Sequence, residues 1–104
     1  MSALVVSPDD QDWWINNRGW AILLERAMRD LSPEERDELE WYANSIGVNF
    51  PRIEPAQHRK VALWLLPAVE ALAGPEAAEQ GWESAENRAH LDELAVMLRR
   101  IAAG

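Results

Sequence analysis

One stretch of this chain, residues 55–73, is apolar around almost its whole circumference when it is wound as an α-helix. Its large apolar side chains are Val61, Leu63, Trp64, Leu65, Leu66, Val69 and Leu72. A helix without a polar face is stable only when other elements surround it. Pro67 removes one backbone donor from its middle and is expected to bend it. The stretch therefore predicts a central helix, kinked at a proline, around which the rest of the chain packs.

A clear helix-start signal precedes this stretch. Ser32 and Glu35 have the spacing of a capping box, and Pro33 stands at the first helical position. Gly47 stands where a glycine in the left-handed conformation commonly ends a helix. These signals predict a helix over residues 33–46.

The two ends of the chain also have helical patterns. Ser7 followed by Pro8 and two Asp residues is typical of a helix N-terminus, and it predicts a helix over residues 8–29. Polar residues around Asn17 interrupt its apolar stripe, so a break at that point stays open. At the other end we expect a helix over residues 85–102. Its buried face is formed by Leu91, Leu94, Ala95, Leu98 and Ile101.

The composition does not favour sheet structure. The chain contains no Thr and few β-branched residues, and only residues 3–6 form a short apolar extended piece. We therefore predict an all-α fold. It is a single domain over residues 1–104, built as a bundle of four or five helices around the central one.

No recognised catalytic or metal-binding motif is present. There is no Cys, the Gly residues are scattered, and three of the Ser residues are explained as helix caps. His58 and His90 fall on different predicted helices, and His90 with Glu86 and Glu93 is typical of a solvated helix face. We therefore expect no enzyme activity, no cofactor and no metal site. A carboxylate acid–base pair is a remote alternative, since 18 acidic residues offer many combinations.

The charge balance is strongly acidic. Asp and Glu number 18 against 10 Lys and Arg, which gives a formal net charge of −8. Nucleic acid is disfavoured as a partner because its phosphates are bound through clustered Lys and Arg. The six Trp residues keep stacking on single-stranded nucleic acid as a second remote alternative. A basic protein is the partner that such a surface favours.

Trp41 does not fit the pattern of its predicted helix. With Leu39 at the centre of the buried face, Trp41 points about 200° away from it, toward solvent. A single large aromatic side chain in that place is typical of a protein-binding surface. The same helix holds the densest acidic stretch of the chain. The predicted partner-binding residues are Trp41, Glu34, Glu35, Asp37, Glu38 and Glu40.

Four further apolar residues fall outside the buried stripes of their predicted helices. They are Ile15, Ile22, Val96 and Met97. Helices that pack against two neighbours would bury such residues in the core. Alternatively, they form a second contact surface, and two copies of the chain make a homodimer through Val96 and Met97 or through Ile15 and Ile22; such dimers are the commonest soluble oligomers.

These observations favour a small acidic module that binds and inhibits a more basic protein. In size, acidity and helical content the chain resembles nuclease-immunity proteins and phage-encoded anti-CRISPR inhibitors. The resemblance rests on those three properties and assigns no residue; it implies a stoichiometric inhibitor of a partner that handles nucleic acids. The alternative is a homo-oligomeric structural or assembly subunit.

The sequence also bears on location. Residues 1–7 carry no basic segment and only a short apolar run, which does not match a signal peptide. The longest apolar run, residues 61–69, is far shorter than the roughly 20 residues that cross a bilayer. We expect a cytoplasmic protein without membrane contact.

Overall fold

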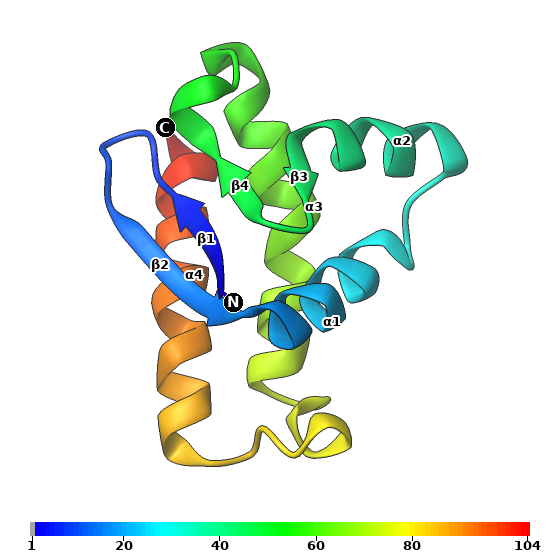
Figure 1. The fold of residues 1–104 in the computed structure, drawn as a ribbon, viewed down its shortest axis with the longest axis vertical. Helices are drawn as coiled ribbons and strands as arrows, with labels where there is room; N and C mark the ends of the chain where they lie inside the picture. Colours follow the sequence, from blue (N-terminus) through cyan, green and yellow to red (C-terminus); the bar gives the residue numbers. More distant parts are fainter. Residues whose placement is uncertain (1) are drawn as a thin grey trace.

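β1 (Ser2–Val6) lies in the middle of a four-stranded sheet in the computed structural model, which describes residues 2–104. It pairs antiparallel with β2 (Asp12–Asn16) and parallel with β4 (Gly47–Asn49). β3 (Ala43–Asn44) pairs antiparallel with β4, so the strand order is β2-β1-β4-β3. Four α-helices complete the part of the chain that the structure describes, and α3 and α4 pass behind the sheet in Figure 1.

The prediction of an all-α bundle is wrong. Residues 8–16, expected to begin a long helix, form a hairpin loop and β2. In the loop the backbone N–H of Asp10 donates to the carbonyl of Ser7, and that of Gln11 donates to the Ser7 hydroxyl, both at 3.0 Å. Asp10 has a φ of +64°, in the left-handed region that Asp tolerates in turns. The string Ser-Pro-Asp-Asp suits a turn as well as a helix N-terminus, and this ambiguity explains the error.

α1 (Asn17–Met28) begins at the point where the sequence left a break open. Asn16 is its N-cap, and the side-chain oxygen accepts a hydrogen bond from the backbone N–H of Gly19 at 2.6 Å. Trp20 is fully buried, and its indole N–H donates to the carbonyl of Asn44 at 2.7 Å. This bond fixes α1 against β3.

α2 (Pro33–Tyr42) has the predicted capping box. The hydroxyl of Ser32 accepts from the backbone N–H of Glu35 at 3.2 Å, and the Glu35 carboxylate accepts from the backbone N–H of Ser32 at 2.9 Å. The helix ends at Tyr42 and not at residue 46, because the residues that follow pair with each other as β3 and β4.

Gly47 begins β4 and does not cap α2. Its φ is +120°, and a Cβ at this position would lie 1.9 Å from the carbonyl oxygen of Leu4. The absence of a side chain allows β1 and β4 to approach each other. Next to this contact, the backbone N–H of Leu4 donates to the carbonyl of Ile46 at 3.0 Å.

The two long helices form the other layer of the molecule. α3 (Pro55–Ala73) has the predicted range and packs along α4 (Ala85–Ala103). η1 (Phe50–Arg52) precedes α3, and η2 (Ala77–Gln80) joins it to α4. α3 also contacts α1 and α2, but it is not surrounded on every side, since Leu63 is 43% exposed. One side of the central helix therefore faces solvent, and its exposed residues are Arg59, Leu63, Pro67 and Glu70.

The core lies between the inner face of the sheet and the helices. β1 contributes alternate residues to it, as a strand with one buried face must. The largest fully buried side chains are Trp20, Phe50, Leu23, Leu39, Leu65, Leu72, Leu94, Leu98, Val5, Val61 and Val69.

Replacing Gly47 with Ala is expected to lower the free energy of unfolding by about 2 kcal/mol or more, because the new Cβ forces β1 and β4 apart. Gly81 offers a matched control. Its φ is +72°, yet a Cβ there would meet no atom within 4 Å. Gly81→Ala therefore carries only the backbone cost, about 1 kcal/mol. Urea unfolding followed by Trp fluorescence measures both variants, and equal losses would contradict the role of the Gly47 contact.

Candidate functional site

The side of the sheet turned away from the helices carries apolar side chains. On β1, Ala3 and Val5 are buried, while Leu4 and Val6 point the other way and are partly exposed. Trp14 of β2 is 53% exposed and lies directly across from Leu4 in the strand register, so both side chains project from the same face. We call the surface formed by Leu4, Val6 and Trp14 the outer sheet face. The same side of the sheet also carries polar side chains, as the solvent-facing side of a one-sided sheet ordinarily does, and these are Ser2, Asp12, Asn16 and Asn49. The three apolar residues form a patch among them.

A hollow of about 560 Å³ lies beside the outer sheet face. Leu4 and Val6 line it from β1, Trp41 lines it from the end of α2, and Ile46 lines it from the turn between β3 and β4. Trp41 and Ile46 are the most exposed large apolar side chains among residues 2–104, at 82% and 67%. The hollow thus joins the outer sheet face to the predicted Trp41 site.

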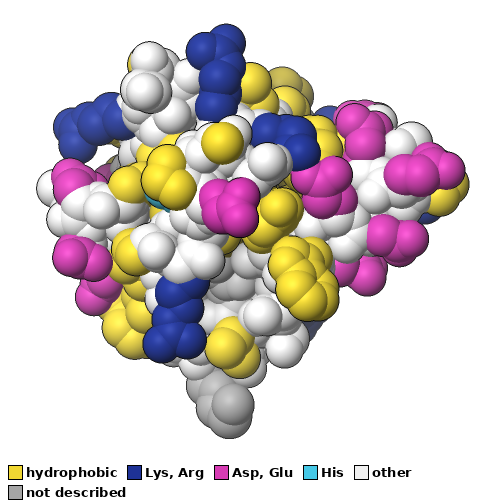
Figure 2. Space-filling model, turned by 90° about the horizontal axis from the view of Figure 1, so that it is seen from above, with side chains coloured by type: hydrophobic (Ala, Val, Ile, Leu, Met, Phe, Trp, Pro, Cys, Tyr) yellow, Lys and Arg dark blue, Asp and Glu magenta, His cyan; other side chains and the backbone are white. Residues whose placement is uncertain are grey.

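α2 projects from the body of the molecule (Figure 1), and Leu39 alone is buried in it. Glu34, Asp37 and Trp41 are spaced by three and four residues, which places them on one stripe of the helix. Figure 2 shows acidic side chains gathered over α2, on the right, with hydrophobic side chains beside them. Glu40 lies outside this stripe and lines a groove between α1 and α2. We call Glu34, Asp37 and Trp41 the α2 stripe.

Two of the five predicted acidic residues serve α2 itself. Glu35 belongs to the capping box, and Glu38 forms an ion pair with Lys60 of α3. The Lys60 ammonium also lies 5.4 Å from the centre of the Trp64 ring. The capping box holds the start of α2, and the ion pair with Lys60 fastens α2 to α3. Glu35 and Glu38 thus stabilise the helix that carries the site.

The four residues of the second predicted surface are not brought together. Ile15 and Ile22 are partly buried against the core and line one cavity, of about 460 Å³. Met97 is buried and lines a different cavity, and Val96 is exposed on α4. The two predicted pairs thus lie apart, and of the four residues only Val96 is exposed. The homodimer through either pair stays a prediction.

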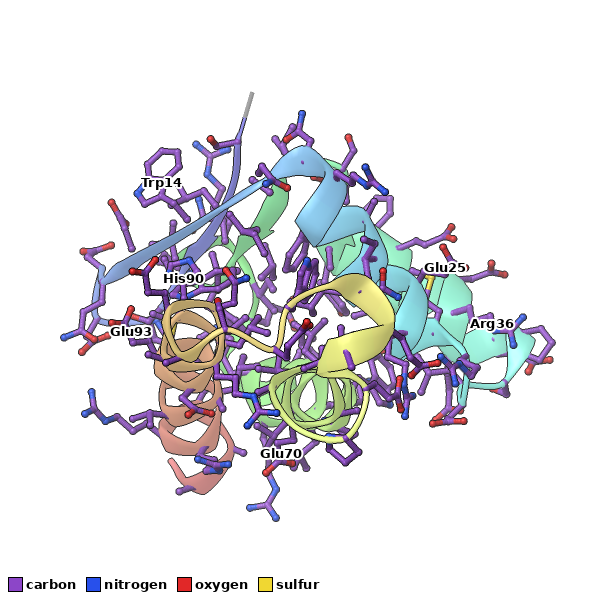
Figure 3. The ribbon with its side chains drawn as sticks, turned by 90° about the horizontal axis from the view of Figure 1, so that it is seen from below. Trp14, Glu25, Arg36, Glu70, His90 and Glu93 are labelled. Carbon is purple, nitrogen blue, oxygen red and sulfur yellow. The ribbon has the colours of Figure 1, made fainter. Side chains whose placement is uncertain are left out.

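His90 holds β2 against α4. Its ring stacks on Trp13 with 4.6 Å between the ring centres, and its Nε2 donates to the carbonyl of Trp14 at 2.5 Å. The indole N–H of Trp13 in turn donates to the carbonyl of His90 at 2.8 Å. Figure 3 shows the result: His90 points toward the strand, and Trp14 points away from α4. Because successive side chains of a strand point to opposite faces, these contacts of Trp13 with α4 also direct Trp14 toward solvent.

His58 also has a structural role. Its Nε2 lies 2.7 Å from the carbonyl of Phe50 and 2.8 Å from that of Ile53, and its ring packs edge-on against Phe50. Among residues 2–104, no group of three or more His, Asp and Glu side chains is placed to hold a metal ion. The two histidines thus hold the backbone near η1 and β2.

From the sequence, one ring of the adjacent Trp13 and Trp14 is expected in the core and the other partly exposed; Trp13 is the buried one and Trp14 the exposed one. The exposure of Leu4 and Ile46 was not predicted. Leu4 and Trp14 belong to strands of five residues each, whose apolar residues 3–6 and 13–15 are continuous and do not alternate with polar ones. Ile46 was assigned to the buried face of a helix that in fact ends at Tyr42. The signal that could have revealed the outer sheet face was the continuity of these two runs, because in a strand successive apolar residues lie on both faces.

No family model, curated protein or solved structure matches this chain. Within the described residues, no helix has the length and apolar character needed to cross a membrane.

The capping box makes the start of α2 sensitive to pH. The backbone N–H of Ser32, with help from its hydroxyl, lowers the pKa of the Glu35 carboxyl below its usual value. The Glu35 carboxylate therefore contributes fully to stability above the usual pKa of a Glu side chain. The contribution is lost as the pH falls through the lowered pKa of the folded protein. We expect the helical Cα chemical shifts of α2 to decline in that acid range.

The matched variant is Glu35→Gln, whose side chain can still accept the hydrogen bond but does not titrate. Its α2 shifts should depend less on pH than those of the unmodified protein. Identical pH profiles for the two proteins would exclude Glu35 as the source of the dependence.

Proposed function

We propose that the protein is a small acidic protein-binding module that uses the α2 stripe to bind a basic protein. The observation that carries the proposal is the 82% exposure of Trp41 on the same helical stripe as Glu34 and Asp37. Water contact with so large an apolar side chain is unfavourable, and burial in a complex relieves it. Trp is also the residue type most often found at the energetic centre of protein interfaces.

The charge of the molecule supports a basic partner. The net charge is −8, and Glu34 and Asp37 make no ion pair among residues 2–104. Carboxylates beside an exposed aromatic ring attract Lys and Arg side chains, which pair with the acids and can lie over the ring. The proposed contact is therefore Trp41 buried at the centre, with partner cations beside it on α2.

A basic surface able to take this helix is typical of a protein that handles nucleic acids. Such surfaces collect Lys and Arg to neutralise phosphates, and grooves for single strands add aromatic side chains on which bases stack. The α2 stripe offers both kinds of contact: Glu34 and Asp37 can pair with Lys and Arg, and the Trp41 ring can stack on aromatic side chains. In its sharpest form, the proposal is a stoichiometric inhibitor that occupies the nucleic-acid-binding surface of its partner.

Trp41→Ala is expected to weaken partner binding by about 2 kcal/mol or more, which is about 30-fold in Kd. The partner is first obtained by affinity capture with the tagged protein from native lysate and is then purified for titration calorimetry. Leu63→Ala is the matched control, because Leu63 is another exposed apolar residue but lies on α3. An unchanged Kd for Trp41→Ala would exclude this residue as the centre of the contact.

Asp37→Asn is expected to slow association with the basic partner and to reduce the dependence of the association rate on salt. Asp92→Asn removes the same charge from an exposed position of α4, on the opposite side of the molecule from α2. It should have a smaller effect on the rate. Stopped-flow measurements at low and high salt compare the two, and equal effects would indicate that only net charge matters.

A further inference from the structure

We infer that the partner's contact continues from the α2 stripe across the outer sheet face to Trp14, and that an apolar segment of the basic partner, flanked by Lys or Arg, covers this face. The inference rests on the proposed function and extends it to a surface outside α2. It also assigns a role to Leu4, Ile46 and Trp14.

Leu4 connects the two exposed Trp residues, although Asn44, Asn49, Arg52 and Glu54 also line the hollow between them. Trp14 and Leu4 are cross-strand neighbours on one face. Leu4, Ile46 and Trp41 line the same hollow, and the backbone bond from Leu4 to Ile46 fixes the spacing of its walls. A hollow of about 560 Å³ is within the range of about 300–1,000 Å³ seen for ligand pockets, so it can take a bulky apolar side chain.

The sheet favours binding on its face over strand addition, because one carbonyl on each edge strand already has a hydrogen-bond partner within the protein. At the β2 edge, the carbonyl of Trp14 accepts from His90. At the β3 edge, the carbonyl of Asn44 accepts from the indole of Trp20, and β3 has only two residues. A partner strand would need such groups to extend the sheet. The outer sheet face is the surface that these bonds leave accessible.

The charges around the outer sheet face point to a basic partner. Asp12 lies opposite Val6 in the strand register and is exposed, and Glu54 lines the hollow. In the hollow Glu54 is balanced by Arg52, so the uncompensated acids are Asp12 beside it and Glu34 and Asp37 of the α2 stripe, none of which makes an ion pair among residues 2–104. A segment with an apolar centre and Lys or Arg on its flanks complements both the apolar floor and this rim.

The same rim disfavours a second copy of this chain as the occupant. Two copies that met through their outer sheet faces would bring two acidic rims together, with only Arg52 of each available to compensate. Like charges across an interface cost several kcal/mol in general, and here both chains carry a net charge of −8.

Three synthetic peptides test the inference on the intact protein. The first has three apolar residues between two pairs of Lys, the second replaces the apolar residues with Ser, and the third replaces Lys with Glu. Binding is followed by NMR through the indole N–H signals of Trp14 and Trp41. We expect the first peptide to shift both signals, the second to shift Trp41 alone, and the third to shift neither.

Trp14→Ser is expected to raise the Kd of the apolar–basic peptide at least about fivefold and to leave the Ser–Lys peptide unchanged. Trp14→Phe should retain most of the affinity, because an aromatic ring remains on the face. Leu63→Ser, a matched loss of an exposed apolar side chain on α3, should have no effect on either peptide.

The inference and the proposed function fail in different ways. If Trp41→Ala weakens both basic peptides and Trp14→Ser weakens neither, the outer sheet face is not part of the contact, although the proposed function stands. If neither basic peptide shifts Trp41, the proposed function itself is contradicted. Binding to phosphatidylcholine vesicles that requires Trp14, or a dimer in sedimentation equilibrium that Trp14→Ser dissociates, would show that another occupant covers the face.

Discussion

The parallel pairing of β1 with β4 is the contact on which the rest of the structure depends. It joins residues 4–6 to residues 47–49, and it requires Gly47, since a Cβ there would meet the carbonyl oxygen of Leu4 at 1.9 Å. The pairing connects the N-terminal hairpin to the unit formed by α2, β3 and β4. Through it, Leu4 lies next to Trp14 in the sheet and lines the same hollow as Trp41.

Local signals in the sequence were sufficient for most of the helices. The capping box at Ser32 gave the start of α2, and the apolar residues of α3 gave its whole length. The strands were not predictable in the same way, because a strand is stabilised by residues far along the chain. Ser7 begins a turn that has the composition of a helix N-terminus, and Gly47 has a positive φ without being a helix C-cap.

The candidate site was predictable only in part, for the same physical reason. Leu39 fixes the inward direction of α2, and the helical period then turns Trp41 toward solvent, as its 82% exposure bears out. Which acidic residues of α2 are paired and which are free depends on tertiary contacts. Glu38 forms an ion pair with Lys60 only because α2 packs on α3. The outer sheet face depends on a sheet that the sequence did not reveal.

The central claim is that Trp41 and the outer sheet face form one protein-binding surface. Hydroxyl-radical footprinting of the protein, alone and bound to its purified partner, tests this most directly because it reports the exposure of individual side chains. The account predicts that binding protects Trp41, Ile46 and Trp14 from oxidation and leaves Leu63 and Val96 as reactive as in the free protein. Protection of Leu63 and Val96, with Trp41 and Trp14 unchanged, would contradict it.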